Sequence, residues 1–88
     1  MPKRFESLKT QLEQQEWPNV YLFKFIVPSD NQTIAKVASM FEETADIQIR
    51  ASSGGNYTSI SVKEIMMNAE SIIEKYIHAS KIKGVITI

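Results

Sequence analysis

The sequence predicts an α+β domain in which four antiparallel strands form one sheet and two helices cover one of its faces. Three observations lead to this prediction. Residues 52–61, SSGGNYTSIS, are typical of a tight turn followed by a strand of alternating polarity. Residues 19–27 are aromatic and β-branched, which favours a buried strand. Residues 32–41 and 69–77 carry apolar side chains at helical spacing.

A short amphipathic helix is expected over residues 3–15, because its apolar side chains recur at helical spacing between charged ones. Trp17-Pro18 should end it, since the residue before a proline is disfavoured in the helical region. We expect Trp17 to anchor this helix. Residues 1–16 are therefore predicted to be an added N-terminal helix, and residues 17–88 the domain itself.

The first strand is expected from residue 19 to residue 27. Ser29 should begin the second helix, because Gln32 follows it at the spacing of a capping box. This helix should end at residues 44–46. One apolar stripe along it, formed by Ile34, Val37, Ala38 and Phe41, should face the sheet.

The next two strands should form a hairpin. Gly54 and Gly55 can adopt the positive φ angles of a tight turn, and Asn56 tolerates them better than most residues. Apolar residues alternate with polar ones on both sides of this turn, and the returning strand is expected over residues 57–66.

Asn68 is a candidate N-cap for the last helix, with Glu70 near its positive end. Gly84 should begin the final strand, residues 85–88. After the leading helix the order is β-α-β-β-α-β. With right-handed crossovers this order gives the ferredoxin-like two-layer sandwich.

The apolar positions of these elements predict one core between the sheet and the helices. Its expected members are Phe23, Phe25, Ile34, Val37, Phe41, Ile47, Ile49, Ile60, Val62, Ile72, Ile73 and Ile77.

Length and composition narrow the function classes. The 88 residues suffice for one domain, and ten basic residues balance ten acidic ones. A neutral chain argues against a dedicated nucleic-acid binder. No cysteine is present, which excludes disulfides and thiolate metal sites. The chain has neither a signal-peptide pattern nor an apolar run of about 20 residues, so we expect a cytoplasmic protein that does not enter the membrane. No cofactor or metal is predicted.

The face of the sheet turned away from the helices is the main candidate for binding. Strand alternation should gather three cations and two hydroxyls there, which suit a carboxylate or a phosphate. The tentative ligand-binding residues are Lys24, Arg50, Ser59, Ser61 and Lys63. Two other interpretations remain open: a merely solvated face, or a contact in a weak homodimer, because Leu22 and Ile26 would otherwise be exposed. The exposed backbone of the second strand is a further route to such a dimer.

The hairpin turn is a second candidate. Its backbone N–H groups could form an anion cradle together with the tentative site residues Ser52, Ser53, Asn56 and Tyr57. The alternative is a turn whose polar side chains bond to their own backbone.

An RNA-binding module is the alternative function, because sheets of this kind bind RNA through stacked aromatic rings. Only Tyr57 is available for stacking unless Tyr21 or Phe23 points outward. Catalysis is not predicted. His78 is the only histidine, and no nucleophile, base and oxyanion site come together in the sequence.

The chain resembles the YbeD-like proteins, a bacterial family of small domains without an assigned activity. The resemblance rests on Trp17-Pro18, the aromatic run ending at Lys24, residues 52–61 and Lys81-Ile82. It implies a fold like that of ACT-type regulatory domains. We therefore expect a non-enzymatic accessory or regulatory domain that binds a small anionic metabolite or a partner protein.

Overall fold

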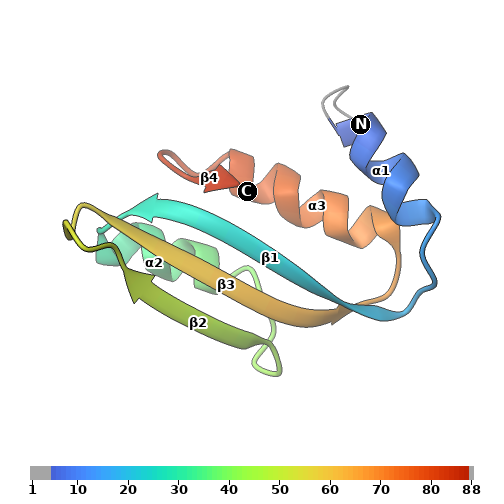
Figure 1. Cartoon of the computed structure of the whole chain (residues 1–88), viewed down its shortest axis with the longest axis horizontal. Helices are drawn as coiled ribbons and strands as arrows, with labels where there is room; N and C mark the ends of the chain where they lie inside the picture. The colour runs from blue at the N-terminus through green and yellow to red at the C-terminus, as the bar shows by residue number, and fades with distance from the viewer. Residues whose placement is uncertain (1–4, 88) are drawn as a thin grey trace.

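The structure, a computed structural model, describes residues 5–87. The first predicted helix begins and the last predicted strand ends outside this range. The helices and strands follow one another in the predicted order (Figure 1). Their bounds are α1 Glu6–Glu13, β1 Asn19–Pro28, α2 Asn31–Ala38, β2 Asp46–Ala51, β3 Tyr57–Met66, α3 Ala69–Ser80 and β4 Ile86–Thr87.

The four strands form one antiparallel sheet in the order β2-β3-β1-β4. The central pair, β1 and β3, is in register from Asn19 opposite Met66 to Pro28 opposite Tyr57. Figure 1 shows α2 behind the strands and α1 at the end of the molecule near the start of α3. This arrangement confirms the ferredoxin-like sandwich with an added N-terminal helix. None of the helices within residues 5–87 is long and apolar enough to cross a membrane.

Strand alternation sorts the side chains between the two faces as predicted. Phe23 and Phe25 in β1 lie opposite Val62 and Ile60 in β3, and all four side chains are fully buried against the helices. Helix α3 covers them with Ile72 and its neighbours.

One predicted core residue is wrong. Ile49 faces the helix side of the sheet but is 53% exposed. The reason is that β2 is an edge strand and α2 ends at Ala38, so no helix of the described chain covers Ile49. Three other expected core members, Ile34, Ile47 and Ile77, are only half-buried at the margin of the core.

The helix ends differ from the prediction. Helix α2 ends at Ala38, not at residues 44–46, because the chain turns at residues 39–45 before it enters β2. Asp30, not Ser29, is the N-cap of α2: its carboxylate accepts from the Gln32 N–H at 3.2 Å and from the Thr33 hydroxyl at 3.0 Å. Asn68 caps α3 as expected and accepts from the Ser71 N–H at 2.8 Å.

Trp17 anchors the leading helix as predicted. Its indole N–H donates to the Leu12 carbonyl at 2.8 Å, and the Leu12 side chain is buried. Helix α1 packs on α3, where Phe5 stacks on Tyr76 with ring centroids 6.2 Å apart.

An aromatic cluster joins β1 to α3. The Tyr76 ring lies 5.5 Å from that of Phe23 and 6.4 Å from that of Phe25, measured between centroids. The Tyr76 hydroxyl shares a 2.8 Å hydrogen bond with the hydroxyl of Tyr21. Burial, together with the hydrogen bond and the charge interaction with Tyr21, raises the pKa of Tyr76 well above that of a free tyrosine.

This raised pKa predicts a loss of stability at alkaline pH. The Tyr76 phenol stays neutral in the folded chain but ionises in the unfolded chain above about pH 10. Its contribution to stability is therefore complete below that pH and is lost as the pH rises through the folded-state pKa. Chemical denaturation from pH 8 to about pH 11 should show a shallower alkaline decline in Tyr76→Phe than in the wild type. Tyr57→Phe is the control, because Tyr57 is exposed. Equal slopes for all three proteins would contradict the assignment.

Candidate functional site

The five tentative ligand-binding residues lie on one face of the sheet, the face turned away from the helices. The register decides this. Lys24 pairs with Ser61, which pairs in turn with Gln48, while Ser59 pairs with Arg50. Directly paired residues of an antiparallel sheet point to the same side. We call Lys24, Arg50, Lys63, Ser59 and Ser61 the cationic cluster. The cluster spans β1, β2 and β3, as the alternation predicted.

Ser61 is at the centre of the cationic cluster. Lys24 lies directly across from it on β1, and Lys63 follows it by two residues on β3. Arg50 is its diagonal neighbour on β2, about 7–8 Å away between Cα atoms. Lysine and arginine side chains are long enough to converge over Ser61 from these three positions. The arrangement can bind one anionic group.

The two hydroxyls of the cluster are unequal. Ser59 donates to the Arg50 carbonyl across a long 3.4 Å contact. The Ser61 hydroxyl makes no hydrogen bond to any residue between 5 and 87, so it can donate to a ligand. All three cations of the cluster are exposed.

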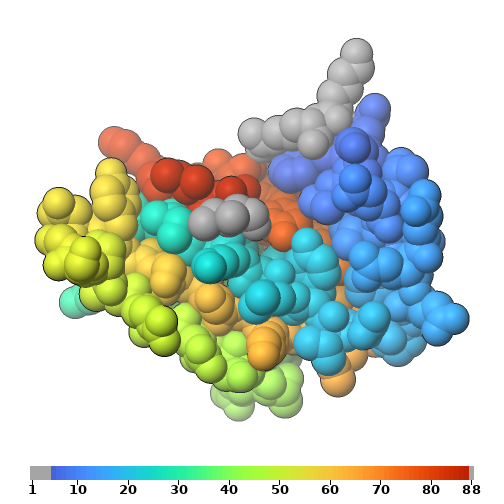
Figure 2. Space-filling model, viewed as in Figure 1, coloured from blue at the N-terminus to red at the C-terminus, as the bar shows by residue number. Residues whose placement is uncertain are grey.

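Apolar side chains flank the cationic cluster on the same face, which is turned toward the viewer in Figure 2. Leu22, 52% exposed, is paired with Lys63, and Ile26 is paired with both Ser59 and Ile86. Both outward orientations were predicted. The face therefore presents three cations between two apolar patches, and the exposed Asp46 carboxylate lies on it directly across from Lys63.

The hairpin turn uses most of its polar groups internally. The Ser52 hydroxyl accepts from the Tyr57 N–H at 3.3 Å, and the Ser52 carbonyl accepts from the Gly55 N–H at 3.0 Å. The Asn56 carbonyl accepts from the Ser29 N–H at 3.1 Å, which ties the turn to the end of β1. Of the turn residues that could adopt a positive φ, only Gly55 does so, at 75°. The side chain of Ser53 is exposed. A ligand role for this turn remains a prediction.

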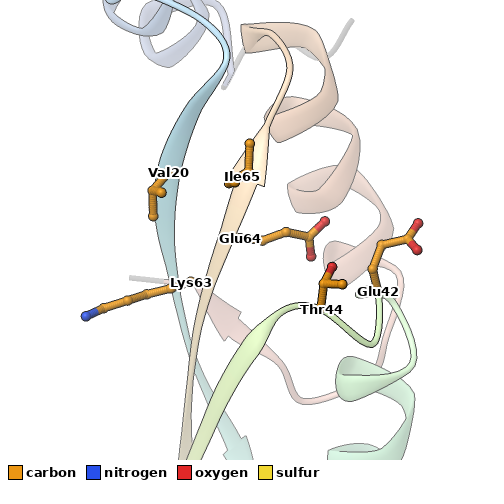
Figure 3. A pocket seen from close by; sticks show the side chains of 6 residues that line it. All are labelled: Val20, Glu42, Thr44, Lys63, Glu64 and Ile65. Carbon is orange, nitrogen blue, oxygen red and sulfur yellow. The ribbon is translucent and has the colours of Figure 1, made fainter.

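A hollow of about 350 Å³ lies where β3 runs beyond the start of β2 (Figure 3). Glu64 points into it from β3, toward Thr44 and Glu42, while Lys63 points to the opposite side of the sheet. The hollow is lined by Val20, Glu42, Thr44, Lys63, Glu64 and Ile65.

Glu64 is the notable residue that the sequence analysis did not single out. One of its carboxylate oxygens, Oε2, is buried without a hydrogen-bond partner among residues 5–87. The signal was available in the alternation of β3, because Glu64 follows Ile60 and Val62 at spacings of two and so faces the helices. Among the described residues, no group of three or more His, Asp or Glu side chains is placed to hold a metal ion.

Residues 13–88 match a family described as "Protein of unknown function (DUF493)". The chain belongs to the DUF493 family. This finding confirms the resemblance to the YbeD-like proteins. No curated protein and no solved structure matches the chain. The DUF493 match begins at Glu13, the last residue of α1, so it covers the sheet and both of its helices.

The candidate RNA surface lacks the aromatic residues that it would need. Phe23 is buried and Tyr21 faces the helices, where its hydroxyl bonds to Tyr76. Tyr57 is thus the only aromatic side chain on the open face among residues 5–87. A single ring does not make the stacking platform of an RNA-binding sheet.

Proposed function

We propose that this member of the DUF493 family is a non-enzymatic accessory domain of the cytoplasm, regulatory in the manner of ACT-type domains, whose open sheet face binds an anionic group. The observation that supports this proposal is the register, which places Lys24, Lys63 and Arg50 around Ser61 on one face, with a Ser61 hydroxyl that bonds to no residue between 5 and 87. Charge-assisted hydrogen bonds to carboxylate and phosphate are about twice as strong as neutral ones. The anionic group would belong to a small metabolite or to an acidic segment of a partner protein.

The surroundings of the cluster support a ligand with an apolar part. Leu22 and Ile26 border the cations on β1, so a ligand whose charged end lies over Ser61 would cover one of them. Covering exposed apolar surface favours binding by roughly 25 cal/mol per Å². A short-chain carboxylate or a phosphorylated small molecule fits this combination better than a bare inorganic ion.

The test compares thermal unfolding with and without anionic probes: citrate, inorganic phosphate and a short poly-glutamate peptide. A ligand of the folded state raises stability by about 2.7 kcal/mol at a hundredfold excess over its dissociation constant. The double variant Lys24→Gln with Lys63→Gln should lose this shift. The matched control is Lys36→Gln with Lys81→Gln, which removes two exposed lysines outside the sheet face.

The outcomes separate the possible functions. A shift that disappears only in the Lys24 and Lys63 variant supports the cationic cluster, and the most effective probe identifies the ligand class. An equal rise in unfolding temperature in both double variants would show that the open face does not bind the anion. So would a wild type whose unfolding temperature no probe raises. Salt-sensitive binding of a single-stranded RNA oligonucleotide would instead favour the RNA-binding module.

A further inference from the structure

Strand β2 forms a bare edge of the sheet. It is the outermost strand in the order β2-β3-β1-β4, and Figure 1 shows it at the margin of the molecule. Natural edge strands are commonly protected by charged side chains, lysine above all, by proline or by a bulge. Residues 46–51 contain no lysine and no proline, and they pair with β3 in an unbroken register without a bulge. The only charged side chains on this edge are Asp46 and Arg50, which have opposite signs.

The hydrogen bonds of the hairpin show which backbone groups of β2 point outward. The Ser52 N–H donates to the Tyr57 carbonyl at 2.8 Å, in register with the pairs of β2 and β3. Bonding direction alternates along an antiparallel strand. Asp46, Gln48 and Arg50 thus bond toward β3, whereas the N–H and C=O groups of Ile47 and Ile49 face the open edge.

The sequence of this edge is complementary to itself when read antiparallel. Residues 45–51 are Ala-Asp-Ile-Gln-Ile-Arg-Ala, a palindrome except that aspartate stands opposite arginine. A two-fold axis at Gln48 would place Asp46 of one copy opposite Arg50 of the other, twice. It would also place Ile47 opposite Ile49, twice. An axis at Ile47 or Ile49 would pair neither charge with its opposite.

We propose that β2 pairs with β2 of a second copy about Gln48, which joins the two sheets into one of eight strands. Each pair of Ile47 with Ile49 exchanges two backbone hydrogen bonds, because both residues point to the open edge. Asp46 and Arg50 then form the closely spaced, non-hydrogen-bonded pairs, with Cα atoms about 4.5 Å apart. On the helix side, the exposed Ile49 gains an apolar neighbour.

The charge pairs are available for this contact. Within residues 5–87, neither the Asp46 carboxylate nor the Arg50 guanidinium forms an ion pair, and both residues are exposed. Opposite charges directly across an antiparallel pair stabilise it, and like charges destabilise it. The contact shares Arg50 with the cationic cluster but does not rest on the proposed function, because a guanidinium has five N–H donors and can bind a carboxylate while also offering donors to a ligand.

The decisive experiment uses two charge reversals that complement each other. Asp46→Arg alone places arginine opposite arginine at both pairs, and Arg50→Asp alone places aspartate opposite aspartate. Sedimentation equilibrium up to about 1 mM, a range suited to a small interface, should show a dimer for the wild type. Each reversal alone should weaken the dimer at least tenfold. Their equimolar mixture should recover it as a one-to-one heterodimer, as should the double reversal in a single chain.

A charge control and a fold control complete the design. Lys83→Asp changes net charge by the same amount as Arg50→Asp, but Lys83 lies in the α3–β4 connection at the other side of the sheet, so the dimer should persist. Circular dichroism must show that each variant is folded. A monomeric wild type at 1 mM, or a mixture no more associated than its components, would overturn the proposal. A dimer lost in Leu22→Asp and kept in Arg50→Asp would also overturn it, and would place the interface on the open face.

Discussion

Replacing Phe25 by alanine should lower the free energy of unfolding by about 3–5 kcal/mol. The Phe25 side chain is fully buried, lies opposite Ile60 and contacts the rings of Phe41 and Tyr76. Its removal loses both transfer free energy and packing around the resulting cavity. The rings around it are held by a central strand and a long helix, which limits how far the cavity can collapse.

Leu22→Ala is the matched control, because it changes a residue of the same strand that points to the open face. Leu22 is 52% exposed, so its truncation should change the free energy of unfolding by only about 0.5 kcal/mol. Urea denaturation of the two variants gives both values. Similar losses in the two variants would contradict the division of β1 into a buried and an open face.

Gly84→Ala should cost about 1–3 kcal/mol. Gly84 has a φ angle of 86°, in the left-handed region that a side chain disfavours. A Cβ atom there would also lie 3.0 Å from Cγ of Pro28 and 3.2 Å from Cδ. The substitution therefore strains the backbone and pushes the connection between α3 and β4 away from the end of β1.

Two other glycines separate these contributions. Gly55 has a φ angle of 75°, but a Cβ there would meet nothing within 4 Å, so Gly55→Ala should show the backbone cost of about 1 kcal/mol alone. Gly54 does not have a positive φ, and Gly54→Ala should be nearly neutral. Thermal denaturation should give the order Gly84, Gly55, Gly54. A cost for Gly55→Ala equal to that for Gly84→Ala would mean that the contact with Pro28 is harmless.

The sheet could be predicted from the sequence because its alternation is strong and two-sided. The bounds of β3 and the outward orientation of Lys24, Arg50 and Lys63 follow from a period of two alone. The same alternation could not show that Ile49 is exposed, because coverage depends on how far α2 reaches over the edge strand. The length of α2 depends on tertiary packing, and the apolar stripe in its sequence does not indicate where the helix ends.

The candidate site divides in the same way. Strand pairing brings the cationic cluster together, so its assembly was predictable. The role of Ser61 at its centre needed the register, which the sequence does not state. The hollow beside Glu64 arises because β3 is longer than β2, and this depends on the relative lengths of paired strands. The cap of α2 at Asp30 was missed because Ser29 and Asp30 are both good caps one residue apart.

The central place of β1 in the sheet has a consequence for how the chain is made. Its hydrogen-bonding partner β3 and its covering helix α3 are both synthesised later, and Phe25 meets Ile60 and Tyr76 only across that span of chain. During translation, the aromatic face of β1 leaves the ribosome before β3 and α3, the two segments that pack against it in the folded chain. Until residue 76 has emerged, the nascent chain exposes a hydrophobic strand, and this strand can associate with neighbouring nascent chains or with chaperones.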